Sequence, residues 1–140
     1  MNRLLSIAAT VFFTVQVYSQ QSSSEVTPNV DPRIVEVFGD QLENLVLNNK
    51  DRLESLTFLL NERVKIVEIP YWEGEGYTKL SEVPLFNPYN KDLKRDEDFN
   101  PYTFNVLKYN MNFHSRGTQY YRVDNSIYVI KILNRNLKDK

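Results

Sequence analysis

The first nineteen residues determine how much chain is left to fold, because they have the pattern of a secretory signal peptide. Arg3 is the only charged residue ahead of an apolar stretch from Leu4 to Val17. Residues 17–19, Val-Tyr-Ser, place small side chains at the two positions that a signal peptidase reads, so we expect cleavage before Gln20. The remaining 121 residues (140 minus 19) suit one domain with a hydrophobic core and are too few for two ordinary domains.

A retained membrane anchor is the alternative interpretation of this segment. An anchor needs roughly 18 to 20 nearly unbroken apolar residues, whereas this stretch is shorter and runs into the polar residues 20–24. The chain contains no cysteine, so it has no disulfide, thiol nucleophile, cysteine-bound metal or lipid-bearing cysteine. We therefore expect a protein exported to the periplasm or the cell exterior, without a lipid anchor and without membrane insertion after cleavage.

The charge balance argues against nucleic acid and anionic membranes as partners. The full chain has 17 basic and 18 acidic residues, and the loss of Arg3 leaves 16 against 18, a net charge near −2. Within the mature chain, the polar residues 20–30 predict a flexible tether. Residues 31–134 are expected to form a single domain, and the basic residues 135–140 a frayed tail.

Two helices are predicted at the start of the domain. Asp31 followed by Pro32 is a typical helix start, because the aspartate can accept hydrogen bonds from free amides and proline needs no amide hydrogen in the first turn. An apolar stripe at helical spacing then runs to Val46. Asp51, with a glutamate three residues later, has the capping-box pattern of a second helix. A tight turn at residues 48–49 would join the two into a helical hairpin.

Four segments have β-strand patterns. The β-branched residues in 64–69 precede Pro70, and residues 104–114 alternate between apolar and polar side chains. Residues 119–123 and 127–133 each follow turn-forming residues. The predicted fold class is therefore α+β, with the N-terminal helical hairpin packed on a small antiparallel β-meander of three to four strands.

A long irregular excursion, residues 71–98, follows the first strand and holds the best candidates for recognition. Tyr71 and Trp72 lie between Pro70 and a loop with two glycines, and Tyr77 comes directly after that loop. Exposed aromatic side chains in such a position can stack on sugar rings or anchor a protein partner. The competing interpretation is that Trp72 folds back as a lid over the core.

A repeated tetrapeptide, Phe-Asn-Pro-Tyr, adds four further aromatic candidates for binding. It contains Phe86 and Tyr89 in its first copy and Phe99 and Tyr102 in its second. Asn-Pro favours a turn, so the flanking rings can insert into the core and pin the ends of the charged loop 90–98. The alternative is that the repeat acts as a peptide-like docking motif.

No metal site is predicted, and only one weak alternative exists. Asp96, Asp98 and Asn100 have the alternating spacing that opens an EF-hand loop. The positions that need glycine and glutamate further along are Pro101 and Leu107, so the pattern fails there. Otherwise this charged segment is expected to be a solvated loop with ion pairs.

No catalytic set stands out either, so we expect no enzymatic activity and no cofactor. His114 is the only histidine, and its pattern is that of a polar strand residue facing solvent. Glu73 and Glu75 could be compared with the acid pair of a glycosidase, but neighbouring loop glutamates are more typical of an exposed surface.

Several short motifs resemble a known group of proteins. The motifs are Val83-Pro84-Leu85-Phe86-Asn87, Asp92-Leu93-Lys94-Arg95-Asp96, Phe99-Asn100-Pro101, Leu107-Lys108-Tyr109 and Tyr121-Arg122-Val123-Asp124-Asn125. Over residues 31–132 the chain resembles a small family of exported proteins from flavobacteria and related Bacteroidota, a family of unknown function. The resemblance implies export and a Bacteroidota origin, and it implies no catalytic residue. The lineage suggests a link to a secretion or gliding apparatus.

These patterns lead to two functional hypotheses. The first is a non-enzymatic envelope protein that binds another envelope protein, as an interaction or accessory module, through residues 71–98 or the free edge of the meander. The second is a carbohydrate or small-ligand binding module that uses Tyr71 and Trp72. The oligomeric state is left open.

Overall fold

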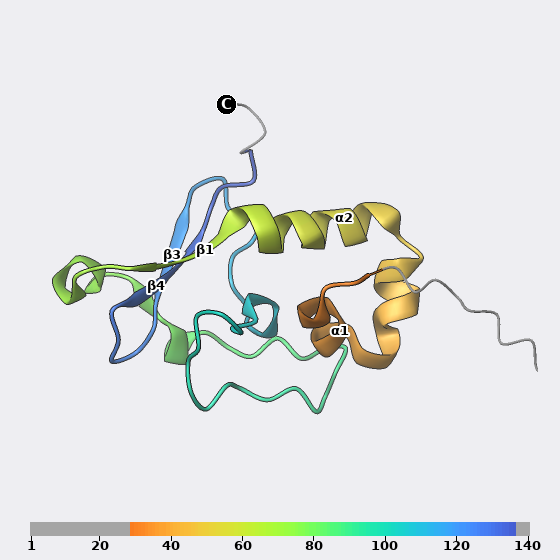
Figure 1. The fold of residues 1–140 in the computed structure, drawn as a ribbon, viewed down its shortest axis with the longest axis horizontal. Helices are drawn as coiled ribbons and strands as arrows, with labels where there is room; N and C mark the ends of the chain where they lie inside the picture. Colours follow the sequence, from red (N-terminus) through yellow and green to blue (C-terminus); the bar gives the residue numbers. More distant parts are fainter. Residues whose placement is uncertain (1–28, 137–140) are drawn as a thin grey trace, which may run out of the picture.

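The computed structural model describes residues 29–136. The expected signal peptide lies outside the described residues, as do most of the expected tether and residues 137–140 of the expected tail. The described chain combines two α-helices with one four-stranded sheet (Figure 1), which confirms the α+β class. Within residues 29–136, no helix has the length and apolar character that a membrane crossing requires.

The regular elements are short, and irregular chain joins them. In chain order they are α1 (Pro32–Phe38), the 3₁₀ turn η1 (Gly39–Gln41), the π-helical turn η2 (Glu43–Leu47), α2 (Lys50–Phe58), the π-helical turn η3 (Leu59–Arg63), β1 (Val64–Glu68), the 3₁₀ turn η4 (Tyr71–Gly74), β2 (Thr78–Lys79), the 3₁₀ turns η5 (Leu80–Glu82) and η6 (Val106–Lys108), β3 (Gln119–Arg122) and β4 (Tyr128–Ile132). Between η5 and β3 only η6 interrupts the irregular chain, so side-chain contacts must hold most of that segment in place.

The first helix starts where the sequence predicts but ends earlier. The Asp31 side chain accepts a hydrogen bond from the Arg33 backbone N–H (2.9 Å), which caps α1 just before Pro32. The helix ends at Gly39, whose φ of +47° is readily adopted only by glycine. The expectation of one helical stripe as far as Val46 is therefore wrong, because the chain turns at Gly39 and continues through η1 and η2.

Replacing Gly39 by alanine is expected to lower the free energy of unfolding by about 1 to 3 kcal/mol. An added Cβ would lie 3.7 Å from the Cβ of Asn90, which is an ordinary contact, so the cost is backbone strain. Urea denaturation followed by circular dichroism measures this cost. Gly117 is the matched control, since its φ is not positive and a Cβ there meets no atom within 4 Å. Equal losses of stability in Gly39→Ala and Gly117→Ala would contradict the prediction.

The second helix is capped by a different residue from the one expected. Asn49 has an extended backbone, and its side chain accepts a hydrogen bond from the Arg52 backbone N–H (3.1 Å), so α2 begins at Lys50. Asp51 therefore lies inside the first turn, and the predicted capping box is wrong. The predicted helical hairpin is not confirmed, because η1 and η2 separate the helices and α1 packs against η6.

The sheet has the strand order β1-β4-β3-β2. Strand β4 has antiparallel partners on both sides, while the two-residue β2 runs parallel to β3. The register places Ile66, Ile130 and Tyr121 in one row across three strands. These side chains belong to the hydrophobic core, so they define the inner face of the sheet.

The strand predicted over residues 104–114 does not form. That segment holds η6 and a single antiparallel bridge between Tyr109 and Leu85, and β1 takes the place beside β4. The alternation behind the prediction is present only in the second half of the segment: residues 104–109 are all buried, whereas Tyr109 and Met111 are buried and the asparagine that follows each is exposed. An irregular segment that turns every second side chain inward produces the same pattern as a strand. The expected meander of consecutive strands is therefore not confirmed.

One hydrophobic core joins both helices, the inner face of the sheet and the irregular chain. Its buried members come from every part of the described sequence and include Ile34, Val46, Leu59, Val83, Phe104, Val106 and Ile130. The excursion therefore divides into an exposed beginning and a continuation that wraps the core.

The Phe-Asn-Pro-Tyr repeats contribute three of their four rings to this core. Phe38 of α1 stacks on Tyr89 with 5.1 Å between ring centroids, and Phe86 meets Tyr89 edge-on at 5.9 Å. Phe99 packs against a ring of the following segment and a ring of β4, at 5.0 and 5.5 Å. Tyr102 is the exception, because its side chain is 95% exposed. Three of the four rings thus pin the charged loop at both its ends.

Arg95 is one of two charged side chains that reach inward from the loop 90–98, in addition to the buried Leu93. Its guanidinium donates hydrogen bonds to the carbonyl oxygens of Leu80 (3.0 Å) and Val83, and it lies over the Tyr109 ring at 5.1 Å from the centroid. Arg95 is exposed, as expected for a solvated loop, and in addition its guanidinium satisfies two backbone acceptors of the excursion.

Asp96 is the second inward side chain, and it compensates a buried lysine. Lys108 is only 6% exposed, and its Nζ lies 2.6 Å from one carboxylate oxygen of Asp96 and 3.4 Å from Glu36. The other Asp96 oxygen accepts a hydrogen bond from the Tyr109 hydroxyl (2.9 Å). Burial raises the pKa of Tyr109 to about 12, which keeps this hydroxyl a donor at neutral pH.

Candidate binding surfaces

The turn η4 lies against the face of the sheet that points away from the core, which we call the outer face. Arg122 of β3 belongs to this face and donates from Nη2 to the Tyr71 hydroxyl (2.9 Å). Its guanidinium also lies over the Tyr71 ring, 4.5 Å from the centroid. Gly74 allows the close approach, since a Cβ there would lie 3.2 Å from the Cδ of Arg122 and 3.4 Å from Ile69. The turn is therefore braced against the sheet mainly by one side chain, Arg122, which contacts Tyr71 and passes close to Gly74.

Trp72 stands on this braced turn with 72% of its side chain exposed. The interpretation of Trp72 as a lid over the core is wrong, because the neighbouring residue Tyr71 makes the contacts with the sheet and leaves the indole in solvent. Tyr71 itself remains half-exposed, at 50%. Two adjacent aromatic side chains are thus presented outward from a fixed backbone.

A second aromatic pair continues this exposed region. Tyr77 stacks on Tyr120 of β3 with 4.8 Å between centroids, and Lys131 of β4 lies over the Tyr120 ring at 5.7 Å. Tyr120 and Arg122 are two residues apart on β3, so they share the outer face. Tyr71, Trp72, Tyr77 and Tyr120 are named the tip surface below.

The remaining aromatic candidates do not join the tip surface. Phe86, Tyr89 and Phe99 are half-buried and packed against the core, as described above. Tyr102 is exposed but lies beside Tyr128, whose side chain faces the inner side of the sheet. Of the seven aromatic residues predicted to bind, Tyr71, Trp72 and Tyr77 belong to the tip surface, whereas Phe86 and Tyr89 contact each other against the core.

The residues of the weak metal alternative are not arranged around a common point. The Asp96 carboxylate is occupied by its two donors, and the Asn100 side-chain oxygen accepts from the Tyr102 backbone N–H (3.0 Å). Asp98 is exposed. Within residues 29–136, no group of three histidine, cysteine or acidic side chains is placed to hold a metal ion.

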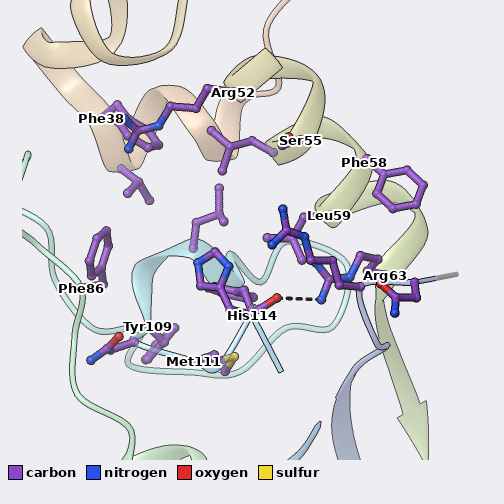
Figure 2. A pocket seen from close by; sticks show the side chains of 17 residues that line it. Phe38, Arg52, Ser55, Phe58, Leu59, Arg63, Phe86, Tyr109, Met111 and His114 are labelled. Atoms are coloured by element: carbon purple, nitrogen blue, oxygen red, sulfur yellow. Dashed lines mark hydrogen bonds between the residues drawn. The ribbon is translucent and has the colours of Figure 1, made fainter. Parts of the chain in front are cut away.

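A second candidate site, which sequence reasoning missed, is a cleft of about 670 Å³ beside α2. Its walls come from α1, α2, η3 and the irregular chain 107–114, and Arg135 and Asn136 close one side. Figure 2 shows Arg52 and Phe38 at one end, Arg63 at the other and His114 between them. The volume falls within the range of about 300 to 1,000 Å³ that is usual for small-molecule sites. We call it the α2 cleft.

The charged side chains that line the α2 cleft are all basic. They are Arg52, Arg63 and Arg135, His114 lies beside them, and among residues 29–136 no aspartate or glutamate lines the cleft. Arg52 and Arg63 come from the contiguous segments α2 and η3, whereas Arg135 lies 72 residues after Arg63, so only the fold brings Arg135 to the cleft. Comparison with protein-family models, curated proteins and solved structures finds no match to this chain.

Proposed function

We propose that the protein is an exported, non-enzymatic binding module that docks another envelope protein at the tip surface. The observation that carries the proposal is Trp72, a fully presented indole on a turn that Arg122 and Gly74 hold against the sheet. The resemblance to exported flavobacterial proteins supports a search for the partner in the Bacteroidota envelope, including its secretion and gliding machinery.

The tip surface has the chemistry that protein interfaces favour at their centre. Trp, Tyr and Arg are the residues most enriched among binding hot spots, and a buried indole can remove a large apolar area from water. A braced turn also loses less conformational freedom on binding than a mobile loop does. The expected partner therefore offers an apolar pocket that receives Trp72, with Tyr71 at its rim.

Replacing Trp72 by alanine is expected to abolish recovery of the partner while changing the free energy of unfolding by less than about 0.5 kcal/mol. The side chain makes few contacts with its own chain, so its loss should not be felt by the core. Chemical crosslinking in the native envelope, followed by affinity purification and mass spectrometry, measures partner recovery. Urea denaturation measures stability.

Tyr102→Ala is the matched control, because Tyr102 is an even more exposed aromatic residue on the other side of the sheet. This variant should recover the partner as the wild type does. Equal loss of the partner in both variants would argue against the tip surface, and a large loss of stability in Trp72→Ala would show that the indole has a structural role.

Carbohydrate binding is the second candidate function, and the adjacent rings of Tyr71 and Trp72 favour it, because exposed aromatic faces can stack on sugars. A glycan array probed with the purified protein separates the two functions. Trp72-dependent binding to a defined glycan, without a stoichiometric protein partner, would replace protein docking by sugar recognition.

A further inference from the structure

The floor of the α2 cleft is apolar. Leu56 and Leu59, from α2 and η3, face Met111 and Phe113 of the irregular chain across the cleft. Leu59 and Met111 are buried, whereas Leu56 and Phe113 keep part of their surface exposed. An apolar ligand segment could therefore be buried here without displacing any part of the core.

Arg63 places a poorly compensated positive charge at one end of this floor. It is 7% exposed, and it donates from Nε to the Leu133 carbonyl (3.0 Å) and from Nη2 to the Phe113 carbonyl (2.8 Å). No carboxylate among the described residues forms an ion pair with it. Among residues 29–136, the side-chain hydrogen bonds of Arg63 run from Nε and Nη2, which leaves Nη1 for a ligand. Buried arginines are normally paired, so Arg63 is positioned to accept an anion.

Arg135 adds a second cation to the same end. The Leu133 backbone N–H donates to the Arg63 carbonyl (2.8 Å), which holds the segment that carries Arg135 beside Arg63, and both residues line the cleft. Burial, and next the positive charge of Arg135, lower the pKa of Arg63. The third arginine, Arg52, makes cation–π contacts instead, because its guanidinium lies over the rings of Phe38 (5.2 Å) and Tyr89 (5.8 Å). The free electrostatic attraction for an anion is therefore concentrated at Arg63 and Arg135.

We propose that the α2 cleft binds a small amphipathic carboxylate. Its hydrocarbon chain lies on the floor formed by Leu56, Leu59 and Phe113, and its carboxylate lies between Arg63 and Arg135. Charge complementarity selects this occupant, because no acidic side chain lines the cleft, although the full chain carries a net charge of −1. A carboxylate at this end would relieve the repulsion between the guanidinium groups and gain charge-assisted hydrogen bonds.

Isothermal titration calorimetry with decanoate, below its micelle concentration, tests the proposal on the purified protein. We expect saturable binding of one decanoate per chain. Decan-1-ol, which keeps the hydrocarbon and lacks the charge, should bind at least about tenfold more weakly. Inorganic phosphate, which keeps a negative charge and lacks the hydrocarbon, should also bind at least about tenfold more weakly.

The charge reversal Arg135→Glu is expected to weaken decanoate binding by at least about tenfold. Arg135 is exposed, so this variant should retain the fold, which circular dichroism verifies. Arg116→Glu makes the same change of charge at an exposed position outside the cleft and should alter the affinity by less than about twofold.

Three results would overturn the assignment. Decanoate and decan-1-ol could bind equally, which would make the cleft a purely apolar site. Arg116→Glu could weaken binding as much as Arg135→Glu, which would reduce the effect to net charge. The ligand-free protein could self-associate through the cleft, which analytical ultracentrifugation would detect as a dimer that decanoate does not dissociate.

Discussion

Replacing Asp96 by asparagine is expected to lower the free energy of unfolding by about 3 kcal/mol. The substitution preserves the shape of the side chain and removes the charge that lies 2.6 Å from the Nζ of Lys108. Lys108 is 6% exposed, so it would keep a buried positive charge with only the more distant Glu36 at 3.4 Å. The Tyr109 hydroxyl would also lose a charged acceptor. Urea denaturation at neutral pH measures the effect.

Asp98→Asn is the control for this experiment. It removes one negative charge from the same loop, but Asp98 is exposed and the structure gives it no hydrogen-bond or ion-pair partner. Its cost should stay within about 0.5 kcal/mol. If Asp96→Asn were equally mild, Lys108 would have to be stabilised by other groups, and the ion pair would not be what holds the loop. Adding Lys108→Met to Asp96→Asn should recover part of the loss, because the uncompensated charge is then gone.

Replacing Ile130 by alanine is expected to destabilise the protein by about 2 to 5 kcal/mol. Ile130 is completely buried at the centre of β4, one of the two inner strands of the sheet. Its neighbours in the register row, Ile66 and Tyr121, are fixed by the sheet and cannot move to fill the space. The lost contacts and the remaining cavity therefore add. Thermal and urea denaturation both report the change.

Ile127→Ala provides a matched comparison three residues earlier. The Ile127 side chain is 48% exposed and lies just before β4, so the same truncation should cost less than about 1 kcal/mol. Similar costs at Ile127 and Ile130 would show that β4 is not an inner strand of the folded protein in solution.

Sequence patterns predicted the elements that local chemistry alone determines. The Asp31-Pro32 start, the β-branched run that forms β1 and the two strands of the C-terminal hairpin all depend on neighbouring residues, and all are present. The helix break at Gly39 was not predicted, because a glycine inside an apolar stripe reads as a weak point and its positive φ is set by the packing around it. The N-cap of α2 was predicted at Asp51 but is Asn49 for a related reason. Both residue types suit an N-cap, and the backbone geometry decides which of them takes that position.

The candidate sites divide in the same way. Tyr71, Trp72 and Tyr77 were predictable because aromatic residues next to a proline and glycines mark an exposed turn. Their brace, Arg122, was not, because it lies 51 residues from Tyr71 and appeared only as part of a strand. The basic end of the α2 cleft could not be predicted for the same reason. Arg63 directly precedes β1 and Arg135 follows β4, so the two arginines come close only when β1 pairs with β4. Buried Lys108 was likewise assigned to solvent by simple alternation.

The two proposed sites are separate, which makes their tests independent. The tip surface lies on the outer face around β3, whereas the α2 cleft lies beside α2 and the chain 107–114. Trp72→Ala should therefore leave decanoate binding unchanged, and Arg135→Glu should leave partner recovery unchanged. If either variant impaired both decanoate binding and partner recovery, the two sites would not be independent.

The strand order also determines how much of the chain must be available before the sheet can form. Within the described residues, β1 pairs only with β4, and Val64 must wait for Ile132, near the C-terminus, before the sheet can close. The first helix likewise waits for Asn105, whose side chain donates to the Arg33 carbonyl (2.8 Å). Contacts so distant in sequence form late and slowly. A chain emerging from a ribosome would thus remain extensible until almost all of it had been released.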